Sequence, residues 1–192
     1  MRVLKTLLLT GLLGATAAAQ AAPATYQLDP HHTMVLFSWS HFGFSHPTAE
    51  LGLGKGTLTF DPQHPEQARV EVTLPLAGLD THVPALDEHL KKPDFLDASK
   101  FPLVTYRSTK VEPIDKDHFR VTGDLTVHGV THPVVLQATL NRIGPHPMDK
   151  SPSIGFDATG TLKRSDFGVS MYAPNVSDDI TLHITTEGSV AK

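Results

Sequence analysis

Apolar and polar residues alternate with a period of two in several separate stretches of the chain. The clearest are residues 69–76, 118–127 and 180–185, where Val, Leu, Ile and Phe alternate with Thr, Arg, Glu, Asp and His. Successive side chains of a strand point to opposite faces, so each stretch predicts a strand with one buried and one exposed face. Weaker alternation covers residues 33–42, 54–60, 102–112, 132–142 and 154–164. We therefore expect about eight strands.

The segments between these stretches are rich in Pro, Gly and Asp, which favour turns. One segment differs, because residues 84–92 (PALDEHLKK) carry acidic side chains early and Lys91 and Lys92 late. That charge order suits the dipole of a short helix, and Pro93 ends it. Many short antiparallel strands and one short helix predict an all-β fold, either a sandwich or an eight-stranded antiparallel barrel.

The interior of such a barrel is either filled by its own side chains or holds one small ligand. Small residues at positions expected to face inward are Gly123, Ala138, Ala158 and Gly160. In a barrel that holds a ligand, these small residues would leave a cavity; in a barrel filled by side chains, they would fit its taper. Aromatic candidates for the interior are Phe37, Trp39, Phe60, Phe95, Phe101, Phe119 and Phe156. Aromatic side chains line lipid cavities and also pack full cores, so the residues alone leave both interiors open.

The first 21 residues have the pattern of a secretory signal peptide. Arg2 and Lys5 precede an apolar stretch (LLLTGLLGAT), and the small residues that follow allow cleavage after Ala19 or Ala21. The apolar stretch is shorter than the roughly 20 residues that span a bilayer. We therefore expect an exported protein with one domain over residues 22–192, about 170 residues long.

The net charge and the absence of known catalytic motifs argue against several classes of function. The formal net charge is −4, and removal of Arg2 and Lys5 makes it −6, which suits nucleic acid poorly. The chain has no cysteine, which excludes a thiol nucleophile and thiolate metal sites. It has no nucleophile elbow, no His-Glu-x-x-His pair and no phosphate-binding glycine loop. The chain has an Asp-Phe-Gly triplet at 166–168, as kinases do, but it lacks the other sequence segments of a kinase, so we take the triplet as a chance match. We therefore expect that the protein is not an enzyme and that it has no catalytic residues and no cofactor.

Twelve histidines keep a metal site open as the alternative. His31 and His41 end one extended run and would lie about 30 Å apart, too far to share one ion. His41 and His46, on either side of a short turn, are the remaining pair in this region. We assign no metal ligand, but a periplasmic protein that binds metal through surface or turn histidines is the alternative function.

Four segments together resemble the YceI-like family of exported bacterial proteins. They are 26–45 (YQLDPHHTMVLFSWSHFGFS), 87–108 (DEHLKKPDFLDASKFPLVTYRS), 121–136 (VTGDLTVHGVTHPVVL) and 161–169 (TLKRSDFGV). In the first segment, Asp29, His32, Phe37, His41 and Gly43 match positions that recur in the family. The resemblance runs in order along essentially the whole mature chain. It also gives the Asp-Phe-Gly triplet a place in a turn.

The resemblance implies a lipocalin-like barrel that carries a long-chain amphiphilic lipid without any chemical step. The lipid is a polyisoprenoid, an isoprenoid quinone or a fatty-acid-like molecule. The protein is expected in the periplasm or secreted, without nucleic acid and without stable membrane insertion, and a homodimer is left open. The expected ligand-binding residues are Val35, Phe37, Trp39, His41, Phe60, Phe95, Phe101, Phe119, Leu125, Phe156 and Arg164. Of these, His41 or Arg164 is expected to meet a polar head group.

Overall fold

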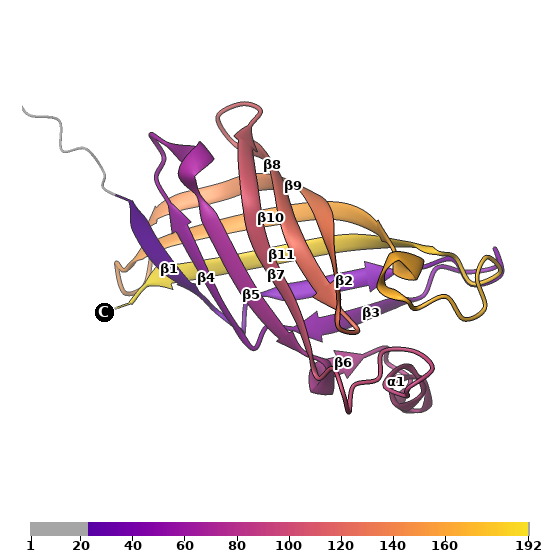
Figure 1. The fold of residues 1–192 in the computed structure, drawn as a ribbon. Coiled ribbons are helices and arrows are strands. Elements are labelled where there is room, and N and C mark those ends of the chain that lie inside the picture. Colours follow the sequence, from indigo (N-terminus) through magenta and orange to yellow (C-terminus); the bar gives the residue numbers. More distant parts are fainter. Residues whose placement is uncertain (1–22, 192) are drawn as a thin grey trace, which may run out of the picture.

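The computed structural model describes residues 23–191, whose strands form one antiparallel sheet that closes on itself (Figure 1). The closed ring consists of β1 (Ala24–Leu28), β4 (Lys55–Phe60), β5 (Arg69–Pro75), β7 (Leu103–Pro113), β8 (His118–Val127), β9 (Val130–Pro145), β10 (Pro152–Lys163) and β11 (Asp179–Val190). Closure comes from pairing of the chain ends, with Tyr26 of β1 opposite Val190 of β11. The predicted eight-stranded antiparallel barrel is confirmed.

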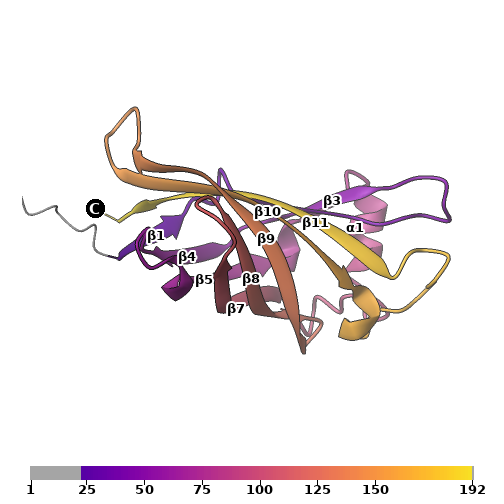
Figure 2. The same ribbon diagram turned by 90° about the horizontal axis from the view of Figure 1, so that it is seen from above.

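Three further strands extend the sheet beyond the ring, and the sequence did not indicate this division. They are β2 (Met34–Ser38), β3 (Thr48–Gly52) and β6 (Leu79–Asp80). One edge of β11 pairs with β1 near its end and with β2 over Thr181–Thr185. The predicted strand at 33–42 is therefore shorter than expected and lies beside the ring, while β1 closes it. Figures 1 and 2 show β3 and α1 at the same end of the molecule as the loop between β10 and β11.

The one α-helix within residues 23–191, α1 (Pro84–Leu90), begins at the proline that the sequence indicated and ends two residues earlier than expected. The Asp87 carboxylate accepts hydrogen bonds from the backbone N–H (2.7 Å) and the hydroxyl (2.6 Å) of Thr81, which fixes the helix to the chain before it. Short 3-10 turns lie at Pro65–Gln67, Leu76–Gly78 and Arg164–Phe167. Within the described residues, no helix is long and apolar enough to cross a membrane.

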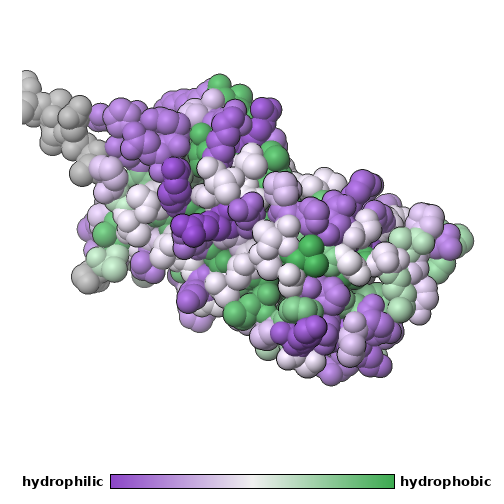
Figure 3. All heavy atoms as spheres, in the orientation of Figure 1, coloured by the Kyte–Doolittle hydropathy of each residue, from purple (hydrophilic) through white to green (hydrophobic). Residues whose placement is uncertain are grey.

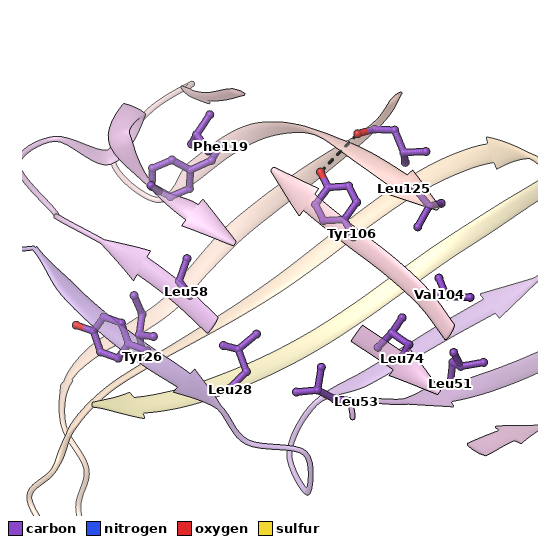
Figure 4. Close-up of a cluster of buried hydrophobic side chains, with 14 of the residues drawn as sticks. Tyr26, Leu28, Leu51, Leu53, Leu58, Leu74, Val104, Tyr106, Phe119 and Leu125 are labelled. Carbon is purple, nitrogen blue, oxygen red and sulfur yellow. Dashed lines mark hydrogen bonds between the residues drawn. The ribbon is translucent and has the colours of Figure 1, made fainter. Parts of the chain in front are cut away.

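The inward face of the barrel is apolar, as the period-two pattern predicted. Figure 4 shows Leu28, Leu58, Leu74 and Leu125, which come from four different strands, among the buried apolar side chains. The buried Tyr106 hydroxyl donates a hydrogen bond to the backbone carbonyl of Val121 (3.2 Å), and burial raises the pKa of this phenol. Its polar atom is therefore satisfied inside an apolar environment.

The inward-facing glycines do not create free space. A Cβ on Gly123 would lie 2.6 Å from the Tyr106 hydroxyl oxygen, and one on Gly160 would lie 2.8 Å from Cδ2 of Leu136. In both places a bulky side chain from a neighbouring strand occupies the volume that the glycine leaves. Any cavity must therefore have another origin.

The predicted signal peptide, residues 1–21, lies outside the described residues. Its cleavage after Ala19 or Ala21, and the single domain over residues 22–192, stay predictions.

Candidate functional site

An apolar cavity of about 760 Å³ lies inside the barrel. Every strand of the ring contributes to its wall, for example Leu28, Leu58, Val72, Tyr106, Val121, Leu136, Ala158 and Leu182. Among the described residues that line it there is no Asp, Glu or Lys. The volume falls within the range of about 300–1,000 Å³ typical of small-molecule sites. The barrel is therefore hollow, which answers the question that the sequence left open.

Three phenylalanine rings, which we call the floor, cluster at one end of the cavity, where the exposed Arg69 also contributes to the lining. The ring centroids of Phe60, Phe119 and Phe156 lie 5.7–6.1 Å apart, and the rings meet edge to face. Such edge-to-face packing is favourable for aromatic rings. Phe60 and Phe119 are among the most deeply buried residues, and all three rings line the cavity. The floor therefore limits how far a ligand can reach into the barrel.

The opposite end opens between three segments, residues 39–47, 81–98 and 168–178, which we call the mouth. His41 from the first segment and Tyr172 from the third line the cavity and are also exposed to solvent. Residues that meet both the cavity and the solvent mark its opening. Figure 1 shows β2, β3 and α1 reaching toward this end of the barrel.

The second segment, with α1, covers part of the mouth with apolar side chains. The buried Phe95 ring has its centroid 4.7 Å from that of His89 and 6.2 Å from that of Tyr172, so it joins the helix to the third segment. Val83, at the start of the helix, lines the cavity and is 51% exposed. The side chains of the second and third segments that line the cavity are therefore mostly apolar.

Hydrogen bonds join the first and third segments of the mouth, two between backbone groups and one from a backbone N–H to a side chain. The Ser40 N–H donates to the Ser177 hydroxyl (2.9 Å), and the Ser177 N–H donates to the Ser40 carbonyl (2.9 Å). Further out, the Phe42 N–H donates to the Asn175 carbonyl (2.8 Å). These bonds make the two loops one continuous edge.

Arg164 lines the cavity, but its guanidinium is engaged with the third segment. Its Nε, Nη1 and Nη2 donate to the backbone carbonyls of Ser177 (2.9 Å), Val169 (2.8 Å) and Val176 (2.8 Å). Partial burial lowers the pKa of the guanidinium. Arg164 therefore holds the loop of the mouth in place. The structure lends no support to its expected contact with a ligand head group.

Ten of the eleven expected ligand-binding residues line this one cavity. They are Val35, Phe37, Trp39, His41, Phe60, Phe95, Phe119, Leu125, Phe156 and Arg164. Their contact with a ligand stays a prediction. The sequence analysis missed His89 and Tyr172, which lie in segments without a period-two pattern, and the aliphatic wall. The aliphatic residues of the wall could have been predicted, because within each strand they alternate in step with the predicted residues and so face the same side.

Phe101 corrects the expectation, because it is not part of the cavity lining. It lies in the loop before β7, where strand alternation does not set the direction of a side chain. Its ring packs 5.1 Å from the His128 ring and covers Gly129, in the tight turn between β8 and β9. At Gly129 a Cβ would lie 2.8 Å from Cδ1 of Phe101, so the glycine makes room for the ring. The role of Phe101 in the fold is to pack this hairpin.

Within residues 23–191, Asp29, His32 and Glu187 form the one group whose side-chain atoms are close enough to share a metal ion. His32 Nδ1 lies 2.8 Å from Asp29 Oδ2 and 3.3 Å from Glu187 Oε1. The hydrogen bond to Asp29 and the charge of Glu187 raise the pKa of His32, and the same bond lowers the pKa of Asp29. The group lies outside the cavity lining and has the geometry of an exposed ion-pair network. His41 and His46, the pair that the sequence left open, are not part of this group.

A model of the YceI-like domain family matches residues 26–188 of the chain. The chain belongs to the YceI-like family. The YceI-like match spans every strand of the barrel, so the resemblance that the four sequence segments indicated is confirmed.

Other proteins that are similar to this chain, in sequence or in solved structure, agree with that assignment. A UPF0312 protein of Pseudomonas syringae pv. tomato is 38% identical over 174 residues, which cover 90% of each chain. A YCEI protein of Campylobacter jejuni has a crystal structure that matches with a TM-score of 0.70 and 31% identity, over 80% of this chain and 90% of that one. A polyisoprenoid binding domain from Saccharophagus degradans matches with a TM-score of 0.62 over 88% of this chain and 99% of that one. Its identity is 12%, so that likeness shows the fold alone.

Proposed function

We propose that this YceI-like protein binds one long-chain amphiphilic lipid, such as a polyisoprenoid, with the tail inside the barrel. The single observation that carries the proposal is the cavity of about 760 Å³, whose wall is mostly apolar, with Arg69 and Arg164 as the charged residues among the described residues that line it. An empty apolar cavity of this size leaves its lining without contact partners, and an apolar tail would restore those contacts.

The chemistry of the wall favours an apolar chain over a polar small molecule. A polar ligand needs buried groups that pair with its own polar atoms, and each unpaired group costs free energy. The wall offers few such groups: the Tyr106 hydroxyl is bound to a backbone carbonyl, and the guanidinium of Arg164 is bound to three. The polar end of the lipid would then lie at the mouth, beside His41 and His89, which both line the cavity.

Binding requires no chemical step, and we propose that the protein is not an enzyme. Lipid binding is supported by the fold shared with the polyisoprenoid binding domain of Saccharophagus degradans. Carriage of the lipid through the periplasm or outside the cell is part of the same proposal. It is motivated by the signal-peptide pattern of residues 1–21.

The proposal is tested by extraction of the purified protein with organic solvent and mass spectrometry of the extract. We expect a long-chain amphiphile at close to one molecule per protein. Ala158→Phe places a ring in the cavity and should remove most of it. The matched control is Thr159→Phe, which places the same ring on the exposed face of the same strand and should leave the bound lipid unchanged. Extracts without such a lipid, together with failure to load one in vitro, would refute the proposal.

A further inference from the structure

The mouth of the barrel carries three aromatic side chains that are more than half exposed to solvent, and of these only Tyr172 also lines the cavity. Phe42 is 51% exposed, Tyr172 is 58% exposed and Phe44 is 93% exposed. We call these three residues the apolar tips. Figure 3 shows green and pale green spheres at this end of the molecule. Exposed apolar side chains grouped at one end of a folded protein commonly mark an interaction site.

The backbone holds Phe42 and Phe44 in a defined turn. The Phe44 N–H donates to the His41 carbonyl (3.0 Å) and the His41 N–H donates to the Ser45 carbonyl (2.9 Å), which closes a hairpin. Phe42 and Gly43 occupy its central positions with φ of 52° and 74°. A left-handed conformation is unfavourable for phenylalanine, so the fold accepts a cost to place this ring. The hydrogen bond from Phe42 to the third segment joins the hairpin to the loop that carries Tyr172.

The two loops that carry the tips are nearly free of charged side chains. Residues 39–47 contain no Asp, Glu, Lys or Arg, and residues 168–178 contain only Asp178, whose carboxylate accepts hydrogen bonds from Ser165, although the chain as a whole has a formal net charge of −4. The turns at the floor end, residues 113–118 and 145–151, contain Asp and Lys in addition to exposed apolar residues. Charged groups resist transfer into an apolar phase and acidic groups are repelled by anionic lipid, so the nearly uncharged end is the one that a membrane surface would accept.

From these observations we infer that the apolar tips dock the mouth onto the surface of a phospholipid bilayer, so that a lipid enters the cavity directly from the membrane. The inference rests on the proposed function. Aromatic rings are favoured in the interfacial layer of a bilayer. Docking of this kind is peripheral, since only loop tips enter the interface. The charged segment 81–98 stays at the water side, because Asp87, Glu88 and Lys92 would resist burial.

The test uses the purified full-length mature protein and vesicles of phosphatidylethanolamine with a minor fraction of phosphatidylglycerol. In flotation, the wild type should partition onto the vesicles. Phe42→Ser with Phe44→Ser should reduce the partition coefficient by about tenfold or more, as expected for the loss of buried phenylalanine. Phe44→Ser alone, at a nearly fully exposed position, serves as a variant with an unaltered fold. The matched control is Ile114→Ser with Met148→Ser, which removes two exposed apolar residues from the floor end and should change nothing.

A second assay separates this inference from the proposed function. A fluorescent long-chain lipid delivered from cyclodextrin should bind the wild type and the Phe42→Ser, Phe44→Ser variant equally, whereas transfer of the same lipid from vesicles should be slower for the variant. If the cyclodextrin-delivered lipid does not bind the wild type, the proposed function fails. If the lipid binds but vesicle partition is absent, or is unchanged by the substitutions, the docking inference is overturned. Loss of a solution dimer in the variant, without vesicle binding by the wild type, would also overturn it and assign the tips to a second copy of the chain.

Discussion

Affinity should rise with the length of the ligand tail and then stop rising at the floor. Each methylene moved from water into the apolar wall contributes about 0.8 kcal/mol. Since about 1.4 kcal/mol corresponds to a tenfold change in Kd, the upper limit is about fourfold per methylene. Ordering of a flexible tail offsets part of this gain. We therefore expect a two- to fourfold fall in Kd per added methylene, until the tail reaches Phe60, Phe119 and Phe156.

The assay is isothermal titration calorimetry with a series of primary alcohols of increasing chain length. Phe156→Ala removes part of the floor, so the length at which Kd stops falling should increase in that variant. Binding should also show a negative heat-capacity change, as expected for burial of apolar surface. Two results would contradict a tail that ends at the floor: a Kd that does not depend on chain length, or a plateau that Phe156→Ala leaves in place while the variant remains folded.

Three further outcomes concern stability. Gly123→Ala should lower the free energy of unfolding in urea by about 1–3 kcal/mol, because its methyl group would overlap the Tyr106 side chain; Gly52→Ala, with open space around it, should have little effect. Arg164→Lys should cost about 2–4 kcal/mol and speed amide hydrogen exchange in residues 168–178, because an ammonium cannot reach all three carbonyls. The raised pKa of His32 means that its ion pairs contribute fully below the ordinary value of 6.5 and are lost as the pH rises through the folded-state pKa. Wild type should therefore exceed His32→Gln in Tm by more at pH 5.5 than at pH 8.5; an equal difference at both would contradict this.

The wall of the cavity could be predicted from the sequence because strand alternation is local. Once residues 69–76 and 180–185 are taken as strands, Val72 and Leu182 must face the same side as the other apolar positions. The closing strand could not be predicted in this way. Its place depends on pairing between Tyr26 and Val190, which lie at opposite ends of the chain, and on β11 sharing one edge between two partners.

The existence of a cavity also depends on contacts that the sequence does not record. Gly123 and Gly160 suggest free volume, but side chains of neighbouring strands occupy it, whereas Ala138 and Ala158 do line the cavity. Side-chain directions in loops could not be predicted either, because the alternation of inward and outward residues holds only within a strand. For this reason Phe101 was assigned to the cavity although its ring packs on a hairpin.

The central claim is that the lipid tail lies inside the barrel, and photo-crosslinking tests it most directly. A long-chain lipid with a diazirine near the middle of its tail would be bound to the protein and irradiated, and the adducts would be mapped by peptide mass spectrometry. We expect adducts on inward residues such as Leu136 and Leu182, and none on the adjacent residues Gln137 and His183 of the same strands. Adducts on Gln137 and His183, or only on the loops of the mouth, would contradict the claim.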